Sequence, residues 1–168
     1  MDNNLKNRFQ HLFEVECLAP DGSVKWKCSD TNIIVNTGLD DILDKYWKGS
    51  AYSASHFVGL TDTVPTVAAA DTMASHVGWT EIQNYTEGTR PALTLGAVAA
   101  QSTTNSATKA SFSVNATVTI GGSFITTNAT KGGTAGTLVG AVAFTGGDKV
   151  ADSGDTLNVT VTLSASSV

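Results

Sequence analysis

The second half of the chain, residues 91–168, is nearly free of charge, because three lysines and three aspartates are its only charged residues. Thr, Ser, Gly, Ala and Val dominate this half instead. Small and β-branched residues of this kind suit pleated strands and tight turns, and they form helices poorly. Since the 168-residue chain is also 41% hydrophobic, it has enough apolar material for one core. We therefore expect a folded, mainly β domain.

Alternation of apolar and polar residues marks the individual strands. The clearest predicted strand spans 156–163, where Leu and Val alternate with Thr and Asn. A longer alternation spans 110–120 and ends at Gly121-Gly122, which predicts a turn. Further strand candidates are 56–60, 80–82, 92–95, 123–127 and 138–144. Many short strands at this spacing indicate an antiparallel β-sandwich or a jelly-roll-like domain.

The N-terminal part of the chain predicts a hairpin between 9–18 and 24–28. The Pro-Asp-Gly sequence between these segments supplies the turn, because Pro fixes φ and Gly accepts positive φ. Cross-strand charge pairing is expected for the outward residues Glu14, Glu16, Lys25 and Lys27. Cys17 and Cys28 could face each other across the strands, but reduced, buried thiols are the preferred interpretation.

One short amphipathic helix is predicted near residues 37–48. Asn36 or Thr37 is its expected N-cap, and Lys48 and Gly49 end it. Five apolar side chains recur at helical spacing and predict a buried stripe: Leu39, Ile42, Leu43, Tyr46 and Trp47. A second, shorter helical turn is predicted for 69–76.

These elements divide the chain into an N-terminal arm, residues 1–8, and a single β-rich domain, residues 9–168. Within the domain, the hairpin and helix occupy 9–50 and the β-sandwich occupies 51–168. The arm is polar and carries little fold signal, so we expect it to order only against a neighbouring molecule.

Charge and hydropathy exclude several classes of function. Ten basic and fifteen acidic residues give a net charge of −5 and a pI near 4.9, whereas nucleic-acid-binding proteins present a basic face. No segment has the apolar run of a signal peptide or of a membrane span. We expect a protein made in the cytoplasm, with neither nucleic acid nor membrane among its partners.

Few residues are candidates for catalysis, metal binding or ligand binding. His56, His76, Asp71 and Trp79 are the best candidates for an enzyme or a carbohydrate-binding module. The two histidines could also meet Asp62 or Asp71 in a metal or acid–base cluster, but their spacing is not a ligand pattern. Packing or capping is the commoner role of such isolated histidines, so we expect no catalysis and no cofactor.

The acidic segment 148–155 has some features of a calcium-binding loop. It lacks the alternating acidic ligands and the closing glutamate of such loops. The preferred interpretation is a turn whose aspartate side chains accept hydrogen bonds from backbone amides.

Aromatic and charged residues gather in the stretch 78–91. Arg90 stands isolated among small polar residues, so we expect it either to pair with Glu81 or Glu87 inside the fold or to meet a partner subunit. Packing or a subunit interface is favoured here over ligand recognition. The candidate interface residues are accordingly Trp79, Tyr85 and Arg90.

The order of these motifs resembles a group of small virion proteins of tailed bacteriophages. The likeness spans about residues 56–163 and rests on Phe57-Val-Gly-Leu-Thr-Asp-Thr, Ala69-Ala-Asp-Thr-Met-Ala-Ser-His, Trp79-Thr-Glu-Ile and Ser153-Gly-Asp-Thr-Leu-Asn-Val-Thr-Val-Thr-Leu163. The resemblance implies a structural protein without cofactors or catalysis. Capsid decoration proteins, tail components and head fibres all share this β-rich, Thr- and Gly-rich character. The group has no catalytic motif, so no functional residue can be assigned from it.

We therefore expect a capsid decoration (cement) protein on the virion surface. It would bind the major capsid protein as a homo-oligomer, expected to be a trimer, and stabilise the head. A tail or fibre structural component is the alternative, and a carbohydrate-binding module or enzyme is a more distant one.

Overall fold

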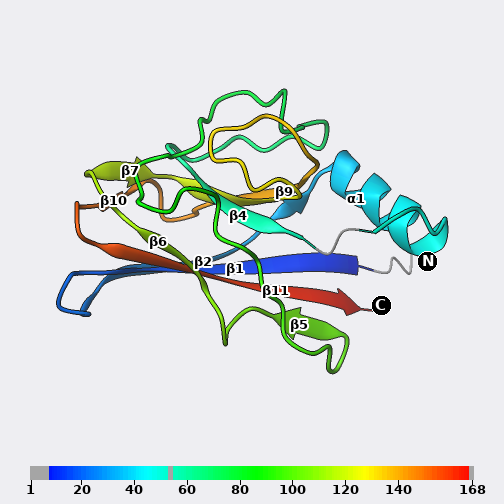
Figure 1. Cartoon of the computed structure of the whole chain (residues 1–168), viewed down its shortest axis with the longest axis horizontal. Helices are drawn as coiled ribbons and strands as arrows, with labels where there is room; N and C mark the ends of the chain where they lie inside the picture. Colours follow the sequence, from blue (N-terminus) through cyan, green and yellow to red (C-terminus); the bar gives the residue numbers. More distant parts are fainter. Residues whose placement is uncertain (1–7, 53–54, 167–168) are drawn as a thin grey trace, which may run out of the picture.

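The computed structural model describes residues 8–52 and 55–166, and two antiparallel sheets make up most of it (Figure 1). The first sheet has the order β2-β1-β11-β5, with β6 also paired to β11. Its strands are β1 (Arg8–Leu18), β2 (Val24–Thr31), β5 (Ser102–Thr104), β6 (Ala110–Ser113) and β11 (Thr156–Ser166). The second sheet has the order β3-β9-β8-β4. Its strands are β3 (Ile33–Ile34), β4 (Phe57–Thr61), β8 (Gly122–Thr126) and β9 (Leu138–Ala143).

Three smaller elements complete the fold. Strands β7 (Val118–Ile120) and β10 (Lys149–Ala151) form a separate antiparallel pair. A single helical arm follows β3 and consists of α1 (Asn36–Ile42) and a π-helical segment, η1 (Leu43–Trp47). The prediction of a mainly β, sandwich-like domain with one short helix is confirmed.

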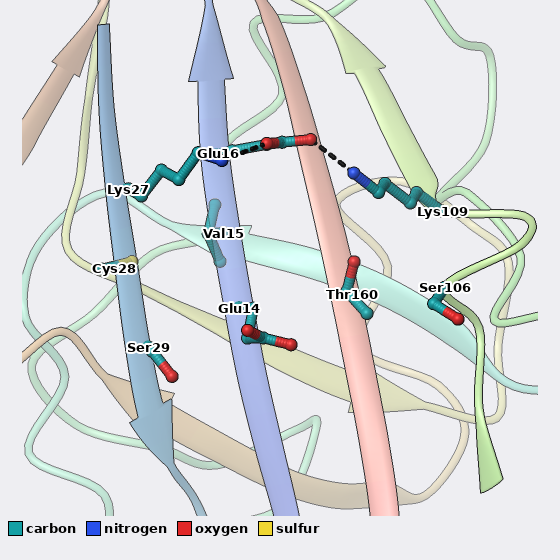
Figure 2. A pocket seen from close by; sticks show the side chains of 9 residues that line it. All are labelled: Glu14, Val15, Glu16, Lys27, Cys28, Ser29, Ser106, Lys109 and Thr160. Carbon is teal, nitrogen blue, oxygen red and sulfur yellow. Dashed lines mark hydrogen bonds and ion pairs between the residues drawn. The ribbon is translucent and has the colours of Figure 1, made fainter. Parts of the chain in front are cut away.

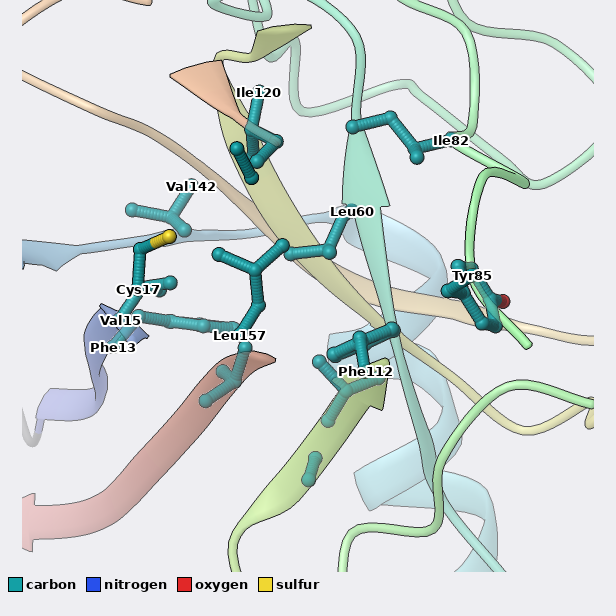
Figure 3. Close-up of a cluster of buried hydrophobic side chains, with 14 of the residues drawn as sticks. Phe13, Val15, Cys17, Leu60, Ile82, Tyr85, Phe112, Ile120, Val142 and Leu157 are labelled. Carbon is teal, nitrogen blue, oxygen red and sulfur yellow. The ribbon is translucent and has the colours of Figure 1, made fainter. Parts of the chain in front are cut away.

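The core lies between the two sheets (Figure 3). Strand β1 contributes Phe13, Val15 and Cys17, and the facing sheet contributes Leu60 and Val142, all at most 1% exposed. Alternate residues of β11 complete the same cluster, as its sequence alternation predicts. A second cluster forms around Phe124 on the other side of β8 and is closed by the loop that carries Met73 and Trp79.

Pairing of β1 with β11 joins the two ends of the described chain. The register runs over eleven residue pairs, from Arg8 opposite Ser166 to Leu18 opposite Thr156. The predicted segments 9–50 and 51–168 therefore share one sheet. The predicted arm, residues 1–8, lies outside the described residues except for Arg8, which begins β1.

The predicted hairpin is confirmed, but only one of its charge pairs forms as expected. Lys27 lies opposite Glu16, with 3.2 Å between Nζ and Oε2. A bulge between Cys17 and Leu18 shifts the register at Lys25. Lys25 Nζ therefore lies 2.6 Å from carboxylate oxygens of Asp152 and Asp155 instead of near β1.

Both cysteines are free thiols, as the sequence analysis expected, but only Cys17 is fully buried and Cys28 is half-buried. Cys17 lies opposite Trp26 and Cys28 lies opposite Val15, so the two do not face each other across the strands. Burial is the main factor that raises the pKa of Cys17 to about 12 and that of Cys28 to about 11. Both thiols are therefore protonated near neutral pH, which makes them poor nucleophiles.

The structure differs from several local predictions. The segment 69–76 forms two turns instead of a helix, because Asp71 accepts a hydrogen bond from Ala68 N and Thr72 bonds with Ser75. The predicted strand 110–120 divides into β6 and β7, since β11 begins opposite Ser113 and offers no partner beyond it. The predicted strands 80–82 and 92–95 reduce to single bridges.

Other predictions failed at element boundaries. Gly121 does not form a turn but carries the chain in extended form from β7 into β8. Val35 is the N-cap of α1, and the Thr37 hydroxyl donates to Leu138 O instead of capping the helix. Sequence reasoning missed β5 and β10, which are three residues each and too short for a periodic signal.

Replacement of Gly59 by Ala tests how tightly the Phe124 ring packs over the neighbouring strand of its own sheet. A Cβ at Gly59 would lie 2.1 Å from Cζ of Phe124, so we expect Gly59→Ala to lower the free energy of unfolding by about 1–3 kcal/mol in urea denaturation. Gly88→Ala is the matched control, because a Cβ there meets no atom within 4 Å. Equal effects of the two substitutions would contradict this packing.

Candidate interaction surface

The three predicted interface residues lie inside the fold. Trp79 is 6% exposed, Tyr85 2% and Arg90 1%. Trp79 stacks against the His76 ring at a centroid distance of 3.6 Å, and Tyr85 packs edge-on against Phe112. All three therefore hold the chain together from within, and none of them presents an outer surface.

Arg90 forms a buried ion pair with Glu81, one of the two partners that the sequence analysis named for it inside the fold. Its Nε and one terminal nitrogen donate to the two oxygens of Glu81 at 2.8 and 2.7 Å. The guanidinium also donates to the carbonyl oxygens of Asn128 and Gly133. The Glu81 contacts hold the guanidinium within the 81–90 stretch, and the two carbonyl contacts tie this stretch to the 128–133 loop.

Three of the four enzyme candidates lie close together, because His76 stacks on Trp79 and interacts electrostatically with Asp71. Asp71 also accepts a hydrogen bond from Ala68 N within its own turn. His56 instead lines a cleft together with His11. Within residues 8–52 and 55–166, no three His, Cys, Asp or Glu side chains are grouped so that they could hold a metal ion.

The 148–155 segment forms the predicted turn, in which aspartate side chains accept hydrogen bonds from backbone amides. Asp148 accepts a hydrogen bond from Val64 N at 2.9 Å, and Asp155 accepts one from Asp152 N at 2.7 Å. The Lys25 ammonium lies between the Asp152 and Asp155 carboxylates. A protein cation therefore already balances these carboxylates.

The outer face of the first sheet carries a shallow polar cleft of about 450 Å³. Figure 2 shows Lys27 and Lys109 reaching Glu16 from opposite sides. Lys109 Nζ lies 2.5 Å from Glu16 Oε1. Glu16 is thus paired both with Lys27 on the neighbouring strand β2 and with Lys109 in the loop before β6, as on a solvated sheet surface.

The helical arm presents its apolar side to solvent. Leu39 is 40% exposed, Leu43 57%, Tyr46 78% and Trp47 76%. We call these four side chains the apolar stripe. The sequence predicted a buried stripe of these four residues and Ile42, and this prediction was wrong except for Ile42, which is half-buried and lines the cleft below the arm. Polar residues Asp41 and Lys45 lie on the inner side of the arm instead, half-buried above a cleft.

Gly38 explains this orientation. It is the buried residue of α1, and a Cβ at this position would lie 2.2 Å from Val139 O of β9. The backbone of the helix therefore rests directly on the backbone of the second sheet. The Thr37 hydroxyl adds a hydrogen bond of 2.8 Å to Leu138 O. These contacts fix the helix with its stripe outward.

A largely apolar cleft of about 980 Å³ lies beneath the arm. Tyr46 and Tyr52 stand at it from the arm side, and Phe57, Leu93 and Leu163 line it from the sheets. Tyr52 is 65% exposed, and Tyr46 belongs both to the apolar stripe and to the lining of this cleft, so the two apolar surfaces adjoin at Tyr46. Exposed apolar regions of this kind mark protein–protein or ligand-binding surfaces.

His11 lines the cleft and is 6% exposed. Burial, with a smaller contribution from His56, lowers its pKa to about 4. Its Nδ1 lies 3.0 Å from the Asn32 side-chain amide, which can donate to a neutral imidazole. A neutral histidine therefore forms part of the cleft wall at physiological pH.

No protein-family model matches the chain, and no curated protein sequence matches it either. No helix in the described residues is long and apolar enough to cross a membrane.

Removal of the Arg90 guanidinium should be strongly destabilising. Arg90→Met leaves the Glu81 carboxylate buried without its cation, so we expect a loss of about 3–5 kcal/mol in the free energy of unfolding. Lys27→Met removes the exposed partner of Glu16 and should cost less than about 1 kcal/mol. Chemical denaturation of both variants measures the difference, and similar losses would contradict a structural role for Arg90.

Acid should destabilise the protein through His11. Between the unfolded pKa near 6.5 and the folded pKa of about 4, the unfolded state binds the extra proton, so stability falls as pH falls. The expected loss is about 3 kcal/mol across this window. Denaturation of the wild type and of His11→Gln at several pH values tests this. The variant should lose less stability between pH 7 and pH 4, and an unchanged pH dependence would contradict it.

Proposed function

We propose that this chain is a bacteriophage capsid decoration protein, a structural subunit that binds the major capsid protein and stabilises the head. The observation that carries the proposal is the apolar stripe on a helix that Gly38 holds in place. The resemblance of residues 56–163 to small virion proteins of tailed phages supports the same role. In this role the protein is made in the host cytoplasm, joins the outer surface of the virion, and makes or breaks no covalent bond.

The energetics of the stripe suit assembly. Full burial of a large apolar side chain contributes roughly 1.5–3 kcal/mol, so four partly exposed ones provide on the order of 5 kcal/mol. Much of this is offset by the loss of rotational and translational freedom on binding. Contacts that are weak singly become effective when linked subunits bind a repeating shell at several points.

Binding to heads tests the proposal. Purified protein should bind expanded phage heads that lack it and raise the temperature at which they disrupt, as measured by sedimentation and thermal light scattering. Leu43→Glu combined with Trp47→Glu should lower the bound copies at least tenfold, because it places charge on the stripe. Val98→Glu is the control, since Val98 is 74% exposed outside the stripe. Failure of the wild-type protein to bind heads would reject this function.

A further inference from the structure

We propose that the apolar stripe pairs with the same stripe of a second copy, so that two helical arms pack antiparallel about a two-fold axis. The inference rests on the proposed function in that it assigns the stripe to contact between subunits of the assembly, so that the linked pair binds the shell through its other surfaces. A two-fold contact is self-complementary, because each patch meets its own copy. The order of charges along the arm and the size of its exposed apolar area both favour a second copy as the partner.

Charge changes sign along the arm. Asp40, Asp41 and Asp44 come first along the arm, and Lys45 and Lys48 follow them. The Asp40 side chain is exposed and makes no hydrogen bond or ion pair with any other described residue. The Lys48 side chain is 76% exposed, and among the described residues its ammonium pairs with Asp44 of its own helix alone. Both residues therefore have capacity for an intermolecular ion pair.

Antiparallel packing uses this charge order. If the pair of arms is centred on Leu43, then Leu39 of one copy lies across from Trp47 of the other. The same register brings Asp40 near Lys48 of the second copy. Three arms running along a three-fold axis, as in the expected trimer, would place like charges together. Opposite charges across a helix pair are favourable, whereas like charges are unfavourable.

The exposed area suffices for a specific dimer. Tyr46, Trp47 and Tyr52 are 78%, 76% and 65% exposed. Because an aromatic side chain buries about 150–250 Å², enclosing these three in both copies removes on the order of 900 Å². Leu39 and Leu43 then bring the total to roughly the 1,200 Å² at which specific interfaces begin. The rigid attachment of the arm through Gly38 limits the ordering cost.

The mass of the purified wild-type protein tests the pairing. Native mass spectrometry and sedimentation at about 20 μM should give a dimer. Leu43→Glu with Trp47→Glu should give a monomer with unchanged circular dichroism, and Val98→Glu should remain dimeric. A wild-type monomer or trimer, or a dimer that survives the double substitution, would overturn the proposal.

Charge exchange tests the antiparallel register. Asp40→Lys should weaken the dimer at least fivefold, because the introduced ammonium would lie near Lys48 of the second copy. Adding Lys48→Asp in the same chain should restore most of the affinity, and failure of this rescue would reject the register.

The two proposals can fail separately. A monomer that still binds heads would overturn the pairing and leave the decoration function in place. A dimer that binds no heads would reject that function and leave the pairing.

Discussion

The structure depends on the pairing of β1 with β11, the first and last strands of the described chain. Eleven consecutive residue pairs join them, and alternate residues of both strands point into the core between the sheets. Contacts so distant in sequence carry a large loop-closure cost before they contribute any stability. Burial of Phe13, Val15 and their β11 partners must offset that cost, so the hairpin and the helical arm cannot be independent of the sandwich.

The position of the helical arm follows from this arrangement. The chain leaves the first sheet after β2, joins the edge of the second through β3, and enters α1 beside β9. Only a residue without a side chain fits between the helix and the Val139 carbonyl, and Gly38 occupies that place. The side of the helix that faces the sheet is therefore fixed by backbone contact, and its larger apolar residues face outward.

Sequence periodicity predicted the strands whose partners extend along their whole length. It identified β11 and the first hairpin because alternating burial extends over many residues. It failed at 110–120, where alternation of burial continues but the hydrogen-bonding partner changes from β11 to β10. Periodicity also identified the helix near 37–48 but assigned its apolar side to the core. The one local signal against that assignment was Gly38, opposite the stripe.

Charge and hydropathy are distributed in an unusual way in this molecule. Arg90 is buried with its donors directed at Glu81 and loop carbonyls, whereas Trp47 and Tyr46 are mostly exposed. An isolated arginine and a tryptophan look alike as surface candidates in a sequence, because sequence alone does not show whether nearby loops supply carbonyl acceptors. The buried cation is satisfied within the chain. The exposed aromatic residues are not enclosed by any of the described residues, so they are available to a second molecule as the proposed pairing requires, whereas Arg90 is not.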